Sequence, residues 1–139
     1  MVDAQQDIKK DRPIFRNIGL AQLIQYRLPW AGKVSILHRV SGAALFLMLP
    51  FLLYLLDQSL ASEISYQKFQ AITGHPLVKI MILGLIWSFL HHFCAGIRYL
   101  LLDLEIGVEK VDANRSAIIV FLLGLALTAI VGLKLFDLY

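Results

Sequence analysis

The sequence has little charge and almost no cysteine. Asp, Glu, Lys and Arg make up 17% of its 139 residues, against about 25% in an average soluble domain. Apolar residues make up 58%, and the mean hydropathy is +0.70. Because a chain this short keeps much of its surface exposed, it could not bury so much apolar surface in a soluble fold. A soluble enzyme, a disordered chain and a disulfide-rich secreted module are therefore excluded.

The single cysteine, Cys94, excludes several kinds of site. One thiol forms neither an internal disulfide nor a CxxC zinc site, an iron–sulfur cage or a CxxCH heme attachment. The net charge is +3, and six of the thirteen basic residues precede residue 34. In a membrane protein, such clustering of basic residues indicates which end of the chain faces the cytoplasm. It does not indicate nucleic-acid binding, so no nucleic-acid partner is expected.

Three segments approach the roughly 20 apolar residues that cross a bilayer, and they cover about 34–56, 77–102 and 117–136. They predict an all-α integral membrane protein with three transmembrane helices, forming one membrane-anchor domain over 1–139. Residues 1–33 are expected to form an N-terminal cytoplasmic and interfacial segment, in which Tyr26 and Trp30 suit the lipid headgroup region. No cleavable secretory signal is visible.

The loops favour one orientation. Basic residues mark the N-terminus and the second loop, 103–116, so the positive-inside rule places both in the cytoplasm. The first loop, 57–76, is expected outside, where Ser62–Ile72 should form a short amphipathic helix on the membrane surface. Pro50 lies inside the first span and should bend it.

Ionisable residues inside a bilayer are costly and usually functional. The first span contains His38 and Arg39, and the second contains His91, His92 and Arg98. The third span is almost uniformly apolar. This distribution predicts a site between the first two spans, whereas the third span should mostly meet lipid or a neighbouring chain.

On the second span, small residues flank His92 at helical spacing: Gly84, Ser88 and Gly96 lie on the same face. The space beside His92 would suit a flat macrocycle, and imidazole is a common axial ligand of heme iron. Alternatively, the small residues only allow close helix packing. His91 points roughly 100° away, so we expect it to be a hydrogen-bonding residue at a subunit contact.

On the first span, Ser35 and Arg39 share a stripe near the cytoplasmic end. They could hold the polar headgroup of a quinone, or Arg39 could extend to lipid phosphates while Ser35 bonds to its own backbone. By helix rise, Arg39 lies roughly 8 Å and His92 roughly 16 Å from the cytoplasmic boundary. Arg98 and His38 could neutralise heme propionates. For Arg98, the alternative is a salt bridge to Asp103 or to a partner chain.

Two motifs resemble a known family. The strings SILHRVSG (35–42) and HHFCAGIRYLLLD (91–103) are similar to signatures of the cytochrome b subunit of succinate dehydrogenase, the larger membrane anchor of respiratory complex II. An Arg-Pro pair near the N-terminus, here Arg12-Pro13, is also typical. Relatives often carry a histidine directly after Gly-Ile-Arg, where this chain has Tyr99.

The resemblance implies roles for particular residues. His92, four residues before Gly96, corresponds to the axial ligand of heme b, and the second ligand comes from the smaller anchor subunit. Ser35 and Arg39 correspond to ubiquinone-site residues, and His38 and Arg39 to neighbours of the heme propionates. The expected partners are that smaller anchor, an iron–sulfur subunit and a flavoprotein subunit that carries FAD.

The sequence therefore predicts a heme b-binding membrane anchor of succinate:ubiquinone oxidoreductase, active only as a subunit of the whole enzyme and without catalytic residues for succinate. One alternative is the anchor of a quinol:fumarate reductase, which runs the same chemistry backwards. Another is a purely structural anchor without heme. A small transporter subunit is disfavoured because the chain has no internal repeat.

Overall fold

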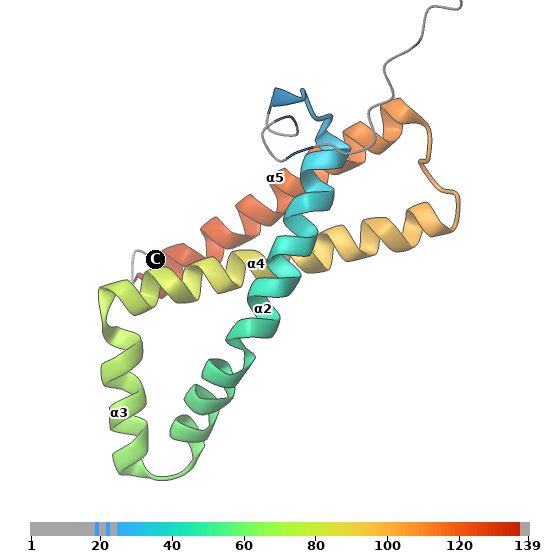
Figure 1. Cartoon of the computed structure of the whole chain (residues 1–139). Helices are drawn as coiled ribbons and strands as arrows, with labels where there is room; N and C mark the ends of the chain where they lie inside the picture. Colours follow the sequence, from blue (N-terminus) through green and yellow to red (C-terminus); the bar gives the residue numbers. More distant parts are fainter. Residues whose placement is uncertain (1–18, 20–21, 23–24, 137–139) are drawn as a thin grey trace, which may run out of the picture.

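The computed structural model describes residues 19, 22 and 25–136, and within these residues the chain is helical. Three long helices are α2 (Trp30–Leu60), α4 (Pro76–Asp103) and α5 (Lys110–Leu135), and the short helix α3 (Glu63–Gly74) joins α2 to α4. Figure 1 shows α4 and α5 running side by side while α2 crosses them, with α3 beside the second half of α2.

Local sequence signals set the helix boundaries. Ser62 caps α3: its side chain accepts a hydrogen bond from the Ser65 N–H, and the Ser65 hydroxyl accepts one from the Ser62 N–H. Pro76 occupies the first turn of α4, where its missing N–H costs nothing. The helix α4 ends where Glu105 adopts a left-handed conformation, with φ at 62°. There the Ile106 N–H donates back to the Leu101 carbonyl.

Small side chains bring α5 against α4. The buried positions of α5 recur at about one-turn intervals, and they are Ala117, Val120, Gly124, Thr128 and Gly132. A β-carbon on Gly124 would lie 3.4 Å from the His91 Cα, so the two backbones approach closely at this point. Close approach through small residues is how helices associate in lipid, where no hydrophobic force drives them together.

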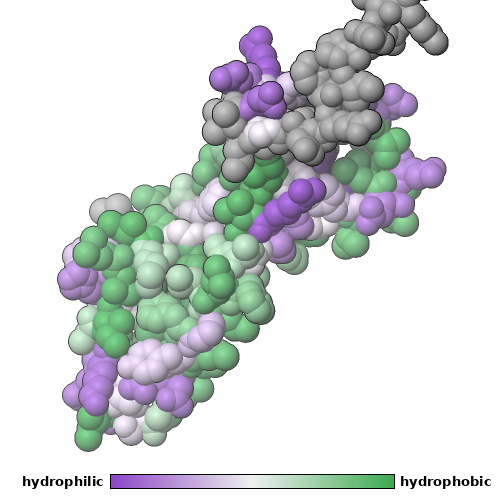
Figure 2. Space-filling model, viewed as in Figure 1, coloured by the Kyte–Doolittle hydropathy of each residue, from purple (hydrophilic) through white to green (hydrophobic). Residues whose placement is uncertain are grey.

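The surface of the three long helices is apolar. Large hydrophobic side chains stay well exposed, for example Phe46 at 74% and Leu47 at 70%, and Figure 2 shows apolar residues over much of the visible face. All three helices are long and apolar enough to cross a membrane. With 31 residues, α2 is about 46 Å long, which exceeds the roughly 30 Å hydrocarbon core. The chain is therefore a multi-pass membrane protein.

The three predicted spans and the connecting helix are confirmed, with different bounds. We predicted 34–56 for the first span, but α2 runs from 30 to 60 and continues through Pro50 as one helix. The third span was expected at 117–136, and α5 begins earlier, at Lys110. Most of the predicted N-terminal interfacial segment, including Arg12-Pro13, lies outside the described residues.

The expectation for the third span needs refinement. Much of α5 is exposed, as a lipid-facing helix should be, but one face packs closely against α4. In the most apolar stretch of each helix, 28% of the residues of α5 are buried, against 11% for α2 and 17% for α4. The helix that looked least distinctive in sequence therefore contributes most to the internal packing.

Candidate functional site

Two histidines from different helices meet where α2 crosses α4. The rings of His38 and His92 stack with centroids 4.1 Å apart and planes 12° from parallel. Tyr99 adds a third ring, with its centroid 5.1 Å from that of His38. The predicted location of a site between the first two spans is therefore matched by a cluster of aromatic and imidazole rings.

The backbone of α2 sets the protonation of His92. Its Nδ1 lies 2.9 Å from the His38 carbonyl oxygen, and a carbonyl can only accept. In this pair Nδ1 must carry the proton and donate, which leaves a lone pair on Nε2 of the neutral ring. The Ser41 hydroxyl also donates to the His38 carbonyl and lies 3.3 Å from Nδ1. A backbone carbonyl on one ring nitrogen is a common way to orient a histidine that binds metal through the other.

Gly42 makes room for this ring. A β-carbon at Gly42 would lie 2.7 Å from Cε1 of His92, closer than real contacts allow, and 3.1 Å from its Nδ1, which is a tight contact. The His92 ring is partly exposed, and its Nε2 is not among the buried polar atoms without a partner. The free lone pair is therefore accessible at the surface of the helices.

The small residues that we expected around His92 lie in different environments. Gly84 is exposed, with open space where a side chain would be. A β-carbon on Gly96 would meet Nε2 of His38 at 3.9 Å. Ser88 is buried, with 7% exposure. We expected open space along this whole face of α4. The structure has open space at Gly84, whereas Gly96 borders the stacked histidines.

An apolar pocket of about 300 Å³ lies between α2 and α4. Its lining residue Phe89 precedes His92 by three residues, about one helical turn, and Leu45 follows His38 by seven, about two turns. Its lining is wholly apolar and includes Val131 of α5. The polar cluster at His38 and His92 thus has an apolar surface on one side.

Ser35 and Arg39 lie one turn apart on α2, next to the histidine pair. Arg39 is exposed and Ser35 is half-buried. Among the described residues, neither side chain has a hydrogen-bond or ion-pair partner. The guanidinium of Arg39 is therefore available to a molecule that approaches from outside the chain.

Arg98 is directed into the protein. Only 5% exposed, it donates from Nε to the Ser116 hydroxyl and from a terminal nitrogen to the Ala113 carbonyl, each at 2.9 Å. Both Arg98 and Asp103 are described, and they form no ion pair, so that predicted alternative is wrong. The observed bonds tie α4 to the first turns of α5. They favour a structural role, and the contact with a heme propionate stays a prediction.

His91 lies inside the chain, so our expectation of a subunit contact is wrong. It is fully buried and stacks on Trp87, with ring centroids 5.3 Å apart. Gly124 of α5 covers it from the other side. Neither ring nitrogen has a partner within hydrogen-bonding distance among the described residues, but the Val34 backbone lies close enough to interact with the ring. The close packing of α5 on α4 explains the difference, because it encloses the face that we had assigned to a partner.

Sequence reasoning missed Ser41 and Ser116, and it found no partner for Tyr99. Ser41 follows His38 by three residues, the spacing at which a serine hydroxyl reaches the preceding turn. Ser116 carries no such signal, because its contact with Arg98 depends on how two helices pack. The Tyr99 hydroxyl is buried without a described partner.

The fold and the histidine pair define a multi-pass membrane protein with a polar site between its helices. Comparison with known proteins gives the family. The chain belongs to the succinate dehydrogenase/fumarate reductase transmembrane subunits, whose family pattern matches residues 9–131. This confirms the resemblance found in the sequence motifs.

Individual relatives agree with this family. The succinate dehydrogenase cytochrome b556 subunit of Coxiella burnetii is 32% identical over 79% of this chain and 89% of its own length. The subunit of the same name from Rickettsia felis is 27% identical over 92% of this chain and 96% of its own length. The subunit of the same name from Paracoccus denitrificans is 29% identical over 66% of this chain and 71% of its own length.

Proposed function

We propose that this chain is the heme b-binding anchor of a succinate:ubiquinone oxidoreductase in a bacterial inner membrane, with its N-terminus in the cytoplasm. It would hold an iron–sulfur subunit and an FAD-containing flavoprotein at the membrane, together with a smaller second anchor. The observation that carries the heme proposal is the hydrogen bond from His92 Nδ1 to the His38 carbonyl. It leaves Nε2 as the ligand atom.

The donor set around His92 suits a heme shared between two chains. Among the described residues, no three His, Cys, Asp or Glu side chains come together as a metal site. An iron held by His92 would take four ligands from the macrocycle, and the family resemblance implies that the other axial ligand comes from the smaller anchor subunit. When bound, heme b supplies a one-electron redox centre. The apolar pocket beside the histidine pair would favour the nonpolar part of such a macrocycle.

Ser35 and Arg39 are the proposed quinone-binding residues. The exposed Arg39 guanidinium would donate hydrogen bonds to a quinone carbonyl oxygen, and the Ser35 hydroxyl could donate to the same headgroup. Reduction of quinone to quinol takes two electrons and two protons. As electrons arrive, negative charge develops on the quinone oxygen, and the Arg39 guanidinium beside it would stabilise that charge. His38 and Arg39 are the proposed neighbours of the heme propionates.

The relatives named above are succinate dehydrogenase subunits, which favours succinate oxidation over fumarate reduction. To test the proposal, the complex is purified by a tag on this chain, and its dithionite-reduced minus oxidised spectrum is recorded. A b-type α band in a fraction that also contains flavin and iron–sulfur partners is expected. Partners without a heme band would disprove the heme role alone, whereas heme without those partners would contradict the anchor role.

A further inference from the structure

A second cavity lies where α2 and α5 begin. It has a volume of about 530 Å³ and is lined by Tyr26, Arg27, Leu28, Pro29, Trp30, Lys33 and Lys110. Three of these seven side chains are cations, and none is a carboxylate. The cavity is large enough for a small-molecule headgroup.

Asn114 holds the two walls of this cavity together. Its side-chain oxygen accepts a hydrogen bond from the Ala31 N–H of α2 at 3.1 Å. Its side-chain nitrogen donates to the Lys110 carbonyl of α5, also at 3.1 Å. One amide thus fixes the first turn of α2 against the first turn of α5, and this places Lys33 and Lys110 on the same cavity.

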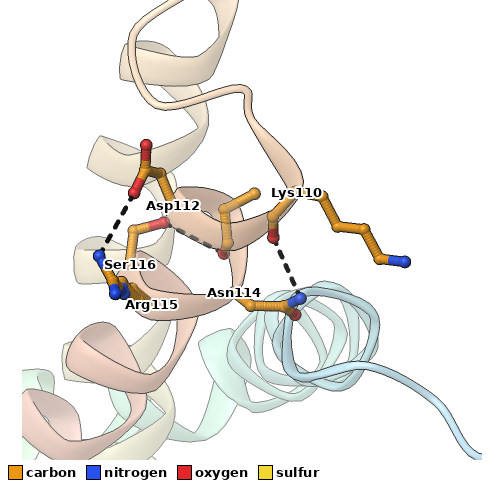
Figure 3. A network of polar contacts seen from close by, with 6 residues as sticks. Lys110, Asp112, Asn114, Arg115 and Ser116 are labelled. Carbon is orange, nitrogen blue, oxygen red and sulfur yellow. Dashed lines mark hydrogen bonds and ion pairs between the residues drawn. The ribbon is translucent and has the colours of Figure 1, made fainter.

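Two acidic residues lie close to Lys110 in sequence, Glu109 directly before it and Asp112 two residues after it, and neither lines the cavity. Asp112 lies 3.9 Å from Arg115 in an exposed ion pair. Figure 3 shows this pair on one side of the first turn of α5, while the Lys110 side chain extends away on the other side. The charge of Lys110 is therefore not neutralised by Asp112.

The start of α2 adds to the positive potential. Pro29 provides no side-chain cap, the first turn contains no acidic residue, and the neutral Asn114 side chain accepts the Ala31 N–H. A helix N-terminus carries up to about half a positive charge, and the contact with Asn114 satisfies one of its N–H groups. Together with Arg27, Lys33 and Lys110, it makes the cavity strongly attractive to an anion.

The position of the cavity points to the membrane interface. The apolar stretch of α2 begins at about Val34, so Tyr26 and Trp30 lie where amphipathic aromatic residues meet lipid headgroups. The Lys33 ammonium lies 4.7 Å from the Trp30 ring centroid, in a cation–π contact at the cavity edge. Basic pockets at helix ends in this region bind the headgroups of anionic lipids.

We propose that this cavity is a binding site for the phosphate group of an anionic phospholipid. The proposal does not depend on the heme and quinone assignments, because it rests on other residues, although Lys33 lies only two residues before Ser35 on α2. The same chemistry would also accept a free phosphate ion, and competition distinguishes the two sources.

The test uses the purified complex and micelles that contain phosphatidylglycerol or, as a neutral probe, phosphatidylcholine. The triple variant Arg27→Gln, Lys33→Gln, Lys110→Gln is compared with Lys68→Gln, Lys134→Gln, which removes cations outside the cavity. We expect phosphatidylglycerol affinity to fall about fivefold for each cavity cation removed. The control variant should bind like the wild type, and Lys33→Arg should retain binding. Lipid binding is read by native mass spectrometry, independently of heme content and quinone reduction.

Three results separate the outcomes. Loss of phosphatidylglycerol in the triple variant only, without displacement by inorganic phosphate, supports the lipid site. Equal displacement by inorganic phosphate supports the phosphate chemistry and assigns the site to a soluble anion. The proposal is overturned if the triple variant binds phosphatidylglycerol like the wild type, or if the control variant loses as much.

Discussion

The Nδ1 atom of His92 lies 2.9 Å from the main-chain carbonyl oxygen of His38, on the facing helix. The contact connects the packing of α2 on α4 to the chemistry of one ring, because it fixes both the tautomer and the orientation of His92. The stacked His38 ring, 4.1 Å away, restricts the same side chain further. Helix α2 therefore acts on the proposed ligand through its backbone as well as through a side chain.

Substituting Gly42 with alanine tests whether this ring position matters. The new β-carbon would overlap Cε1 of His92 at 2.7 Å, and the ring cannot move aside without losing its bond to His38. Overpacking of this kind costs about 1–3 kcal/mol. We expect Gly42→Ala to lower heme occupancy, measured as heme per complex from the pyridine hemochrome spectrum.

Gly84→Ala is the matched control, because no atom lies within 4 Å of the added carbon. It should leave heme occupancy at the wild-type value. Alanine is the better helix former, so any loss in Gly42→Ala would come from the contact and not from the helix. Equal occupancy in both variants would show that the His92 position is unimportant for heme.

Arg39→Leu should separate the two activities of the complex. Removing a charged donor from developing negative charge typically costs about a hundredfold or more in rate. We expect succinate:quinone reduction to fall on that scale, while succinate reduction of a soluble dye stays unchanged. Arg39→Lys should retain part of the quinone activity, since it keeps the charge but loses the planar fork.

The control for Arg39 is Arg115→Gln, because Arg115 belongs to an exposed ion pair with 75% of its side-chain surface accessible. Such pairs contribute about 0–1 kcal/mol, so both activities should persist. If Arg39→Leu reduced the dye activity as much as the quinone activity, a local quinone role would be refuted.

Arg98→Leu tests the link between α4 and α5. The substitution removes two hydrogen bonds from a charged, buried donor and leaves the Ala113 carbonyl and the Ser116 hydroxyl without it. Hydrogen bonds to charged groups contribute about 1.5–3 kcal/mol each. We expect a lower thermal inactivation temperature of the complex, and a smaller decrease for Ser116→Ala.

A heme midpoint potential separates the two roles proposed for Arg98. If Arg98 only links the helices, the potential in Arg98→Leu should match that of Ser116→Ala. A potential much lower than in Ser116→Ala would show instead that the guanidinium interacts with a propionate, as the sequence predicted.

Much of the fold could be predicted from sequence, because hydrophobic length and local caps indicate directly where helices form in lipid. The start of α3 follows from Ser62, whereas the role of His92 as a heme ligand stays a prediction. The sequence placed a site between the first two spans, and the contact of His38 with His92 lies there.

The remaining features depend on how α5 packs, and an almost uniformly apolar helix gives little indication of which face is buried. For this reason the partner of Arg98 and the enclosure of His91 were not predictable. The signal was present in the small residues Ala117, Gly124, Thr128 and Gly132, whose spacing marks the face against α4.

The reduced-minus-oxidised spectrum of His92→Ala, compared with His91→Leu, tests the central claim most directly. The two residues are neighbours on α4, but His91 is buried, and its ring nitrogens have no partner at hydrogen-bonding distance, with the Val34 backbone close by. Replacing it with an apolar side chain should therefore cost no more than about one hydrogen bond, about 0.5–1.5 kcal/mol. The account predicts that His92→Ala loses the low-spin b-type α band while His91→Leu retains it. A normal band in His92→Ala, or its loss only in His91→Leu, would contradict the account.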